Sequence, residues 1–220
     1  MTGRGVSATR DKEGFRMDTT FPESQTLKNL MLAFAGESQA RNRYTFAAAL
    51  CRKQGFHVLD AVFTFTANQE KEHAQVFCNH MKVVAGRQVS IAGDFPVCLS
   101  NDALDLLRMA RDNEYQEAGG LYPAFGRTAR DEGYPEIADS FERIAAIEQS
   151  HGNRFARYMD LLQSGGLYVS DTEQAWLCLN CGHIHYGTEV PKACPVCNHP
   201  QGFFIRLEAA PYGGSGVLTS

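Results

Sequence analysis

Apolar residues recur at helical spacing through most of the first 163 residues. The clearest run lies between Ser24 and Gly55, with apolar side chains at Leu27, Leu30, Met31, Phe34, Ala40, Tyr44, Ala47 and Ala48. Residues three and four positions apart share one face of an α-helix. The pattern therefore predicts a helix over residues 24–54, which Gly55 ends because glycine is favoured just past a helix C-terminus.

The same periodicity predicts three further helices, over residues 57–85, 102–131 and 135–163. The polar residues 100–102 offer a cap for the third helix of the chain. Between the second and third helices, residues 87–99 include Gly93 and Pro96. This segment is predicted to be an irregular crossover.

The two helical pairs resemble each other in the order of their chemistry. A glutamate lies fifteen residues after Gly55 and after Gly133, and a histidine follows each glutamate by three residues. These residues are Glu70 with His73, and Glu148 with His151. Upstream, Glu37 precedes the first of these glutamates by 33 residues, and Glu114 precedes the second by 34. A duplicated helical hairpin joined by a longer crossover predicts an all-α four-helix bundle.

The repeated carboxylates and imidazoles predict a site for two metal ions. A glutamate and a histidine three residues apart project together from a helix. Burying so many carboxylates uncompensated would cost several kcal/mol each. Two divalent cations remove that cost, and imidazole favours iron over calcium or magnesium. One such pair alone is usually a solvated surface feature, but two at matched offsets favour a di-metal site.

Three nearby residues carry weaker signals. Glu117 lies three residues after Glu114, and by spacing alone it is an ordinary surface carboxylate. Tyr44 and Tyr122 lie on the same helical faces as the glutamates, and by spacing alone they are core residues with satisfied hydroxyls. His57 has no matched partner and is assigned no functional role.

Four of the seven cysteines form two Cys-x-x-Cys pairs, namely Cys178, Cys181, Cys194 and Cys197. Four thiolates suit a tetrahedral zinc or a single iron. Iron is favoured by Gly182 after the first pair, by Pro195 inside the second, and by the surrounding aromatic residues Trp176, Tyr186, Phe203 and Phe204. A structural zinc ribbon is the alternative. The remaining three, Cys51, Cys78 and Cys98, are predicted to be buried.

The composition of the chain narrows the classes of function and partner that remain possible. The chain is 44% hydrophobic and 21% charged with a net charge of −4, which is typical of a globular protein and argues against nucleic-acid or membrane partners. No apolar stretch has the length of a membrane helix or a signal-peptide core, so a cytoplasmic location is predicted. The predicted organisation is a flexible leader (1–22), the bundle (23–163), a linker (164–174), a small metal domain (175–208) and a tail (209–220).

Taken together, these motifs resemble the rubrerythrin family. The resemblance is carried by residues 36–40, 70–74, 114–123, 148–151 and 176–204. It implies a ferritin-like bundle with a small C-terminal rubredoxin-like domain of β-strands and loops that holds one iron in a tetrahedral four-cysteine site.

The resemblance also implies roles for the residues of the di-iron site. Glu70 and Glu148 would bridge the irons, Glu37 would be terminal on one iron, and Glu114 and His151 would bind the other. One of the irons would be bound by Glu117 when oxidised and by His73 when reduced, with Tyr44 and Tyr122 beside the centre.

The implied activity is a non-haem di-iron peroxidase that reduces hydrogen peroxide to water in oxidative-stress defence. Electrons would enter through the cysteine-bound iron from a rubredoxin or a separate NAD(P)H-linked reductase. Subunits would pair head to tail as homodimers or form a higher homo-oligomer. Two alternatives are a ferritin-like iron oxidation and storage protein and a simple electron carrier. Asn113, Gly120 and Asn198 depart from the family pattern, although asparagine tolerates the left-handed backbone conformation that glycine would adopt at Asn198.

Overall fold

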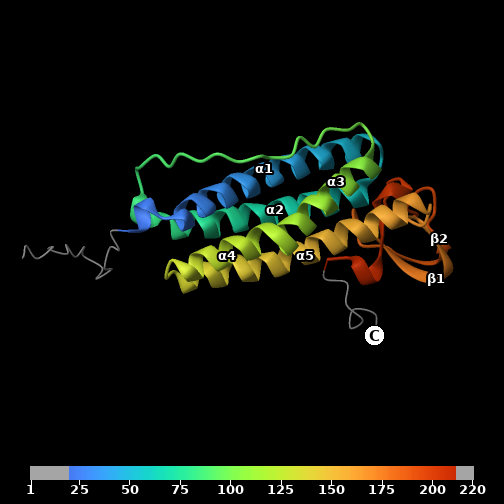
Figure 1. Cartoon of the computed structure of the whole chain (residues 1–220). Helices are drawn as coiled ribbons and strands as arrows, with labels where there is room; N and C mark the ends of the chain where they lie inside the picture. Colours follow the sequence, from blue (N-terminus) through green and yellow to red (C-terminus); the bar gives the residue numbers. More distant parts are fainter. Residues whose placement is uncertain (1–19, 212–220) are drawn as a thin grey trace, which may run out of the picture.

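The structure, a computed structural model, describes residues 20–211 and confirms a helical bundle with a small C-terminal domain of strands and loops (Figure 1). The helices of the bundle are α1 (Gln25–Lys53), α2 (His57–His80), α3 (Ala103–Gln116), α4 (Tyr122–Asp131) and α5 (Pro135–Gln163). The predicted leader lies outside the described residues except at residues 20–22, where Phe21 begins a 3-10 turn and is buried. No helix in the described part of the chain is both long and apolar enough to cross a membrane.

Side-chain caps and glycines set the ends of the helices. The hydroxyl of Ser24 accepts a 3.0 Å hydrogen bond from the first-turn backbone of α1, and the carboxylate of Asp102 accepts one of 2.7 Å at the start of α3. Gly55 and Gly133 have φ angles of 82° and 87°. Because this left-handed conformation disfavours other residues, glycine ends both hairpin helices at equivalent positions.

The second helix is shorter than predicted, and a long crossover follows it. Regular helix stops at His80, and a 3-10 turn (Lys82–Val84) replaces its expected last turn. The crossover then runs along α1 without helix or strand, as predicted (Figure 1). A Cβ added at Gly93 would lie 2.7 Å from Cδ2 of Leu32, so the crossover approaches α1 closely there.

A π-helical turn, η3 (Glu117–Leu121), joins α3 to α4 and explains the unequal spacing of the repeat. Glu37 precedes Gly55 by eighteen residues, whereas Glu114 precedes Gly133 by nineteen. A π-turn takes one more residue than an α-turn. The additional residue is therefore absorbed in η3, and both halves of the bundle keep their glutamates facing inward.

Two apolar clusters fill the bundle on either side of its central glutamates. The cluster nearer the small domain includes Tyr44, Phe63, Leu107 and Phe155, and the other includes Leu30, Phe77, Tyr122 and Phe141. Along α1, α2 and α5, the glutamates fall between the members of these clusters. The polar groups are consequently enclosed by apolar side chains at both ends.

The small domain is a three-stranded antiparallel sheet in the order β2-β1-β3. Its strands are β1 (Val169–Cys178), β2 (Ile184–Glu189) and β3 (Phe204–Arg206). Because β1 starts at Val169, the segment predicted as a linker is in part a strand. Trp176 and Phe204 are fully buried in its core, but Tyr186 is 56% exposed and does not contribute to the expected apolar shell.

The small domain sits on the turn between α1 and α2. The rings of His57 and Phe203 stack with centroids 3.9 Å apart. Beside them, a Cβ added at Gly202 would lie 1.9 Å from the backbone oxygen of Gly55. Backbone therefore meets backbone at this contact, and the domain is held against the end of the bundle.

Candidate metal centres

Four glutamates and two histidines meet in the middle of the bundle. Glu37 comes from α1, Glu70 and His73 from α2, Glu114 from α3, and Glu148 and His151 from α5. Each is at most 7% exposed. The 3.6-residue repeat brings them together, since each helix carries its polar residues at positions that otherwise face the core.

Their ligand atoms form two groups. In the first, Nδ1 of His73 lies 2.8 Å from Glu148, 3.1 Å from Glu70 and 4.0 Å from Glu37. The ligand atoms of these four residues all lie within 4.8 Å of one another. The group has the composition of a site for one cation.

The second group has the same composition as the first, with Glu114 and His151 in place of Glu37 and His73. Nδ1 of His151 lies 2.8 Å from Glu148, 2.9 Å from Glu70 and 3.6 Å from Glu114. Glu70 and Glu148 belong to both groups. Two cations held here would share these two carboxylates, whereas Glu37 and Glu114 would each face one cation.

The residues fit metal ions because they leave many of one another's polar atoms without a hydrogen bond. Both oxygens of Glu148, Oε1 of Glu70, and both ring nitrogens of His151 are buried without a hydrogen-bond partner. Buried polar atoms are rarely left so. Their atoms converge at short distance without hydrogen-bond geometry, as ligands of a common ion do. Carboxylates and imidazoles together are the ligand set of ferritin-like di-iron proteins.

Without cations the cluster would have to bind protons. Burial, and then repulsion from neighbouring carboxylates, raises the pKa of Glu37 well above its usual range. Burial alone lowers the pKa of each histidine, but contacts with the glutamates outweigh it and raise the pKa of His73 to about 9 and of His151 to about 11. The concentrated negative charge thus requires positive charge at the places that two cations would take.

Two tyrosines hold the outer glutamates. The hydroxyl of Tyr44 donates to Oε1 of Glu114, and that of Tyr122 donates to Oε1 of Glu37 at 2.5 Å. Both side chains are at most 3% exposed. They are the core residues that spacing predicted, and their hydroxyl partners are glutamates of the metal cluster.

Glu117 lies beside the cluster and not within it. It is the first residue of η3 and is half-buried. A Cβ added at Gly36 would lie 4.0 Å from its Oε1 and 3.9 Å from Phe95 of the crossover. Burial, and then the charges of Glu148 and Glu70, raises the pKa of Glu117 to about 8. It is therefore not the solvated surface carboxylate that spacing alone indicated.

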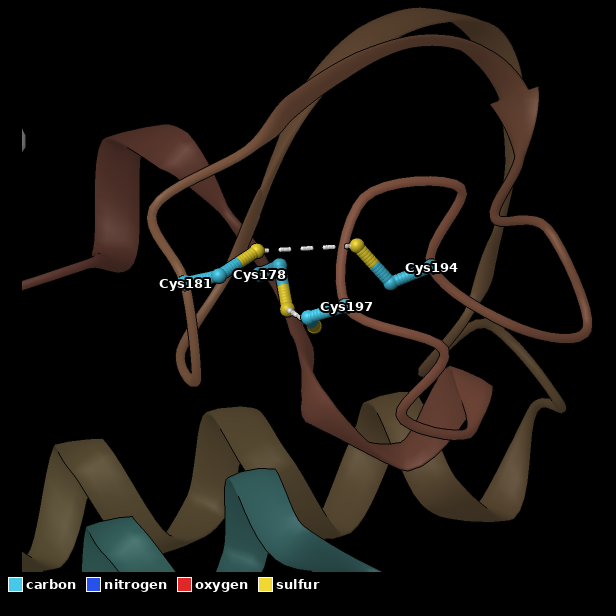
Figure 2. A group of neighbouring side chains, drawn as sticks. All are labelled: Cys178, Cys181, Cys194 and Cys197. Carbon is cyan, nitrogen blue, oxygen red and sulfur yellow. Dashed lines mark hydrogen bonds between the residues drawn. The ribbon is translucent and has the colours of Figure 1, made fainter.

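The four paired cysteines face one another across two loops of the small domain (Figure 2). Sγ of Cys178 lies 3.8 Å from that of Cys197, and Sγ of Cys181 lies 3.6 Å from that of Cys194. A tetrahedral ion with metal–sulfur bonds of about 2.3 Å separates its sulfurs by about 3.8 Å. The four side chains fit one such ion.

The two cysteine loops are built alike. The backbone N–H of Gly182 donates to the carbonyl of Cys178, and that of Asn198 donates to Cys194, at 2.8 and 2.9 Å. Gly182 has a φ angle of 76° and Asn198 one of 59°. Asparagine therefore adopts the left-handed conformation as expected, and both loops close in the same way.

Some sequence-based assignments need correction. Cys51 is buried as predicted, but Cys78 is exposed and Cys98 is partly exposed. His57, to which no role was assigned, contacts the small domain through Phe203. Residue spacing could not reveal this contact, because the two residues are far apart in the sequence.

The fold and these two sites define a class: a ferritin-like bundle with a carboxylate–histidine di-iron site, joined to a rubredoxin-like four-cysteine domain. Residues 28–159 match the family profile described as Rubrerythrin, and residues 176–205 match that described as Rubrerythrin, rubredoxin-like domain. The chain belongs to the rubrerythrin family.

Named relatives agree with this assignment. The chain is 40% identical to rubrerythrin of Porphyromonas gingivalis over 90% of this chain and 97% of that protein. It is 39% identical to rubrerythrin of Nitratidesulfovibrio vulgaris over 84% and 95% of the two chains. Among solved structures, fully reduced, all-ferrous nigerythrin has a TM-score of 0.56 and 27% identity, over 92% of this chain and 100% of that one.

Proposed function

We propose that this protein is a non-haem di-iron peroxidase that reduces hydrogen peroxide to water and protects the cell from oxidants. The observation that carries the proposal is the presence, in one chain, of a two-cation carboxylate–histidine cluster and a four-sulfur site suited to one-electron transfer. A storage protein needs the first site but has no use for the second.

The reaction takes up two electrons and two protons for each peroxide, breaks its O–O bond and releases two water molecules. Two ferrous ions would supply both electrons at one place, which suits a two-electron acceptor. The protein residues would hold the ions and exclude bulk water. The two apolar clusters that enclose the site exclude bulk water from it.

Within the cluster we assign Glu70 and Glu148 as bridging ligands, because both belong to the two groups. Glu37 is then terminal on one ion and Glu114 on the other. The hydroxyls of Tyr122 and Tyr44 orient these two carboxylates, each through a hydrogen bond to one oxygen. Such outer contacts fix the geometry of ligands and tune the ion they hold.

His73 and Glu117 would hold the same ion in its two oxidation states. His73 is placed to bind the reduced ion, since its Nδ1 lies among three carboxylates. Glu117 lies nearby but outside the group, and we assign it to the oxidised ion. A neutral imidazole suits the less charged state, whereas a carboxylate offsets the added charge after oxidation.

Electrons would enter through the four-cysteine iron. Cys181 is exposed and Val196 beside the site is 68% exposed, which gives a donor access to the sulfurs. The donor would be a rubredoxin or an NAD(P)H-linked reductase. From the contact at His57, Glu70 lies thirteen residues along α2, about 20 Å at the rise of an α-helix. A head-to-tail homodimer would shorten this path by placing one subunit's cysteines beside its partner's bundle.

Stopped-flow mixing of the reduced, iron-loaded chain with peroxide tests the proposal. The di-iron site should oxidise faster with peroxide than with dioxygen, and a reducing donor should sustain turnover. In Cys178→Ala the pre-reduced bundle should react once and then stop, while the control Cys78→Ala should turn over. Preference for dioxygen, with iron accumulating beyond these sites, would instead indicate storage. Unchanged donor-driven turnover in Cys178→Ala would make the small domain structural.

A further inference from the structure

Arg43 of α1 has two buried nitrogens without a hydrogen-bond partner in the part of the chain that the structure describes. Its Nε and Nη1 are shielded from solvent, and neither has a hydrogen-bond partner among the described residues. It also makes no ion pair within 4.0 Å in the described part of the chain. A guanidinium is always charged and only donates hydrogen bonds, so buried N–H groups of this kind call for an anionic partner.

The available anion is the carboxylate of Glu117. Arg43 lies seven residues after Gly36, on the same face of α1, and Gly36 is where the Glu117 oxygen approaches that helix. On the facing helix, Asn113 lies one turn before Glu117. It lines a cavity of about 10 Å³ together with Arg43, Tyr44 and others. Arg43 lies beside Asn113, and Glu117 lies one turn further along α3, so Arg43 and Glu117 occupy neighbouring parts of the α1–α3 contact.

The effect of Arg43 on the pKa of Glu117 is consistent with this placement. Among the influences on the pKa of Glu117, which burial chiefly raises, Arg43 is a cation that lowers it. The two charges therefore interact although the side chains form no ion pair within 4.0 Å. Glu117 belongs to the π-turn, where the backbone departs from α-helix geometry. Among residues 20–211 its carboxylate belongs to neither metal group and has no ion-pair partner within 4.0 Å.

We propose that Arg43 is a positioning residue for Glu117: across the α1–α3 contact, its guanidinium charge attracts the Glu117 carboxylate when this is not bound to metal, and so sets the balance between the bound and unbound positions. The inference rests on the ligand exchange proposed above and names the group that makes it reversible. A carboxylate leaving the ion would otherwise remain buried without a counter-charge. With Arg43 it exchanges one positive partner for another.

The direction in which Arg43 changes metal affinity follows from the competition between Arg43 and the metal ion for the Glu117 carboxylate. With divalent ions bound, Glu117 would be off the metal and facing Arg43. Arg43→Gln removes the competitor, so Glu117 should bind the ion and raise its affinity. Loss of a nearby positive charge also favours a cation, whatever Glu117 does. The two contributions separate in the Glu117→Gln background, where only the second can persist.

Cobalt(II) titration of the metal-free full chain measures this without any turnover. Arg43→Gln should raise cobalt affinity about fivefold over the parent, and the same substitution in Glu117→Gln protein should change it less than about twofold. Arg43→Lys keeps the charge and should stay near the parent. Arg41→Gln is the matched control, since Arg41 is exposed on the same helix. Helical content and the visible absorption of the cysteine-bound iron check that each variant folds.

A redox titration of the iron-loaded protein gives the second measurement. Arg43→Gln should shift the midpoint potential of the di-iron pair downward, because the reduced state loses its partner for Glu117, and most of the shift should vanish in the Glu117→Gln background. Equal effects in both backgrounds, or effects no larger than those of Arg41→Gln, would overturn the role of Arg43. If Glu117→Gln itself changes neither the potential nor the peroxide rate, the ligand exchange fails and the role of Arg43 fails with it.

Discussion

The hydroxyl of Tyr122, at the start of α4, donates a 2.5 Å hydrogen bond to Oε1 of Glu37 in the middle of α1. The equivalent contact in the other half of the bundle joins Tyr44 to Glu114. In each half, a phenol from one helix thus fixes a glutamate of another. The approximate two-fold symmetry of the metal cluster extends to these supporting contacts.

Replacing Tyr122 with phenylalanine should weaken metal binding while preserving the fold. The ring is fully buried among Phe77, Phe125 and Phe141, and phenylalanine fills the same space. Loss of the hydroxyl frees Glu37 to reorient, and removal of such an outer contact typically costs 10- to 100-fold in metal affinity. Ferrous or cobalt titration measures this. Tyr158→Phe, buried in the other cluster, is the control, and equal affinities in both variants would contradict the supporting role.

The carboxylates shared by the two groups should matter more than the unshared ones. Glu70→Ala or Glu148→Ala should remove both ions of the bundle, since each residue belongs to both groups. Glu37→Ala should chiefly weaken one ion. Iron analysis, with the visible absorption of the four-cysteine iron as an internal reference, distinguishes these outcomes. Glu72→Ala, exposed on α2, is the control. A full pair retained without Glu70 or Glu148 would refute the bridging assignment.

A methyl group at position 202 should loosen the small domain from the bundle. The Cβ of Gly202→Ala would lie 1.9 Å from the backbone oxygen of Gly55, which cannot move aside as a side chain could. Overpacking of this kind costs about 1–3 kcal/mol. Thermal melting followed at the cysteine–iron absorption should begin at a lower temperature. Gly120→Ala meets nothing within 4 Å and should not destabilise the protein. If Gly202→Ala lost its cysteine–iron absorption at the same temperature as the parent, the backbone contact could move to accommodate the methyl group and the prediction would be wrong.

Glu132 should stabilise α1 in a pH-dependent way. Its carboxylate accepts hydrogen bonds from the backbone of Gln25 and Thr26 at 3.0 and 2.8 Å, and another from the Thr26 hydroxyl. Burial alone raises the pKa of Glu132, but these hydrogen bonds outweigh it and lower the pKa. A carboxyl whose folded-state pKa is lowered contributes stability above its unfolded pKa and loses it as the pH falls through the folded pKa.

Glu132→Gln should therefore cost about 1 kcal/mol near pH 7, a figure typical of a helix N-terminal cap and moderated by solvent. The difference from the parent should begin to shrink as the pH falls past about 4.3, the unfolded pKa of glutamate, and should disappear only below the lower folded-state pKa. Denaturant unfolding at several pH values measures it, with Asp131→Asn as the charge-matched control. A difference that does not depend on pH would mean that the contact depends on shape and not on charge.

Much of the fold could be predicted because its signals are local. Helical periodicity, the cap expected within residues 100–102 and the glycine at 55 act within a few residues, and the structure has them where the sequence indicated. The end of α2 at His80 and the start of β1 at Val169 were misjudged. After His80 the 3-10 turn places Val84 in the core, and Val169 pairs with Glu189 of β2; local preference does not reveal either contact.

The sequence by itself determined which residues could bind metal, because a repeated Glu-x-x-His and two Cys-x-x-Cys pairs specify chemistry through spacing alone. The tertiary structure decided how the contacts are shared: that Glu70 and Glu148 belong to both groups, that Glu117 stands outside them near Arg43, and that His57 meets Phe203. Periodicity assigns a residue to a face of its own helix, but the partner across the bundle depends on how helices are rotated and offset against one another. Packing of the whole core sets that arrangement.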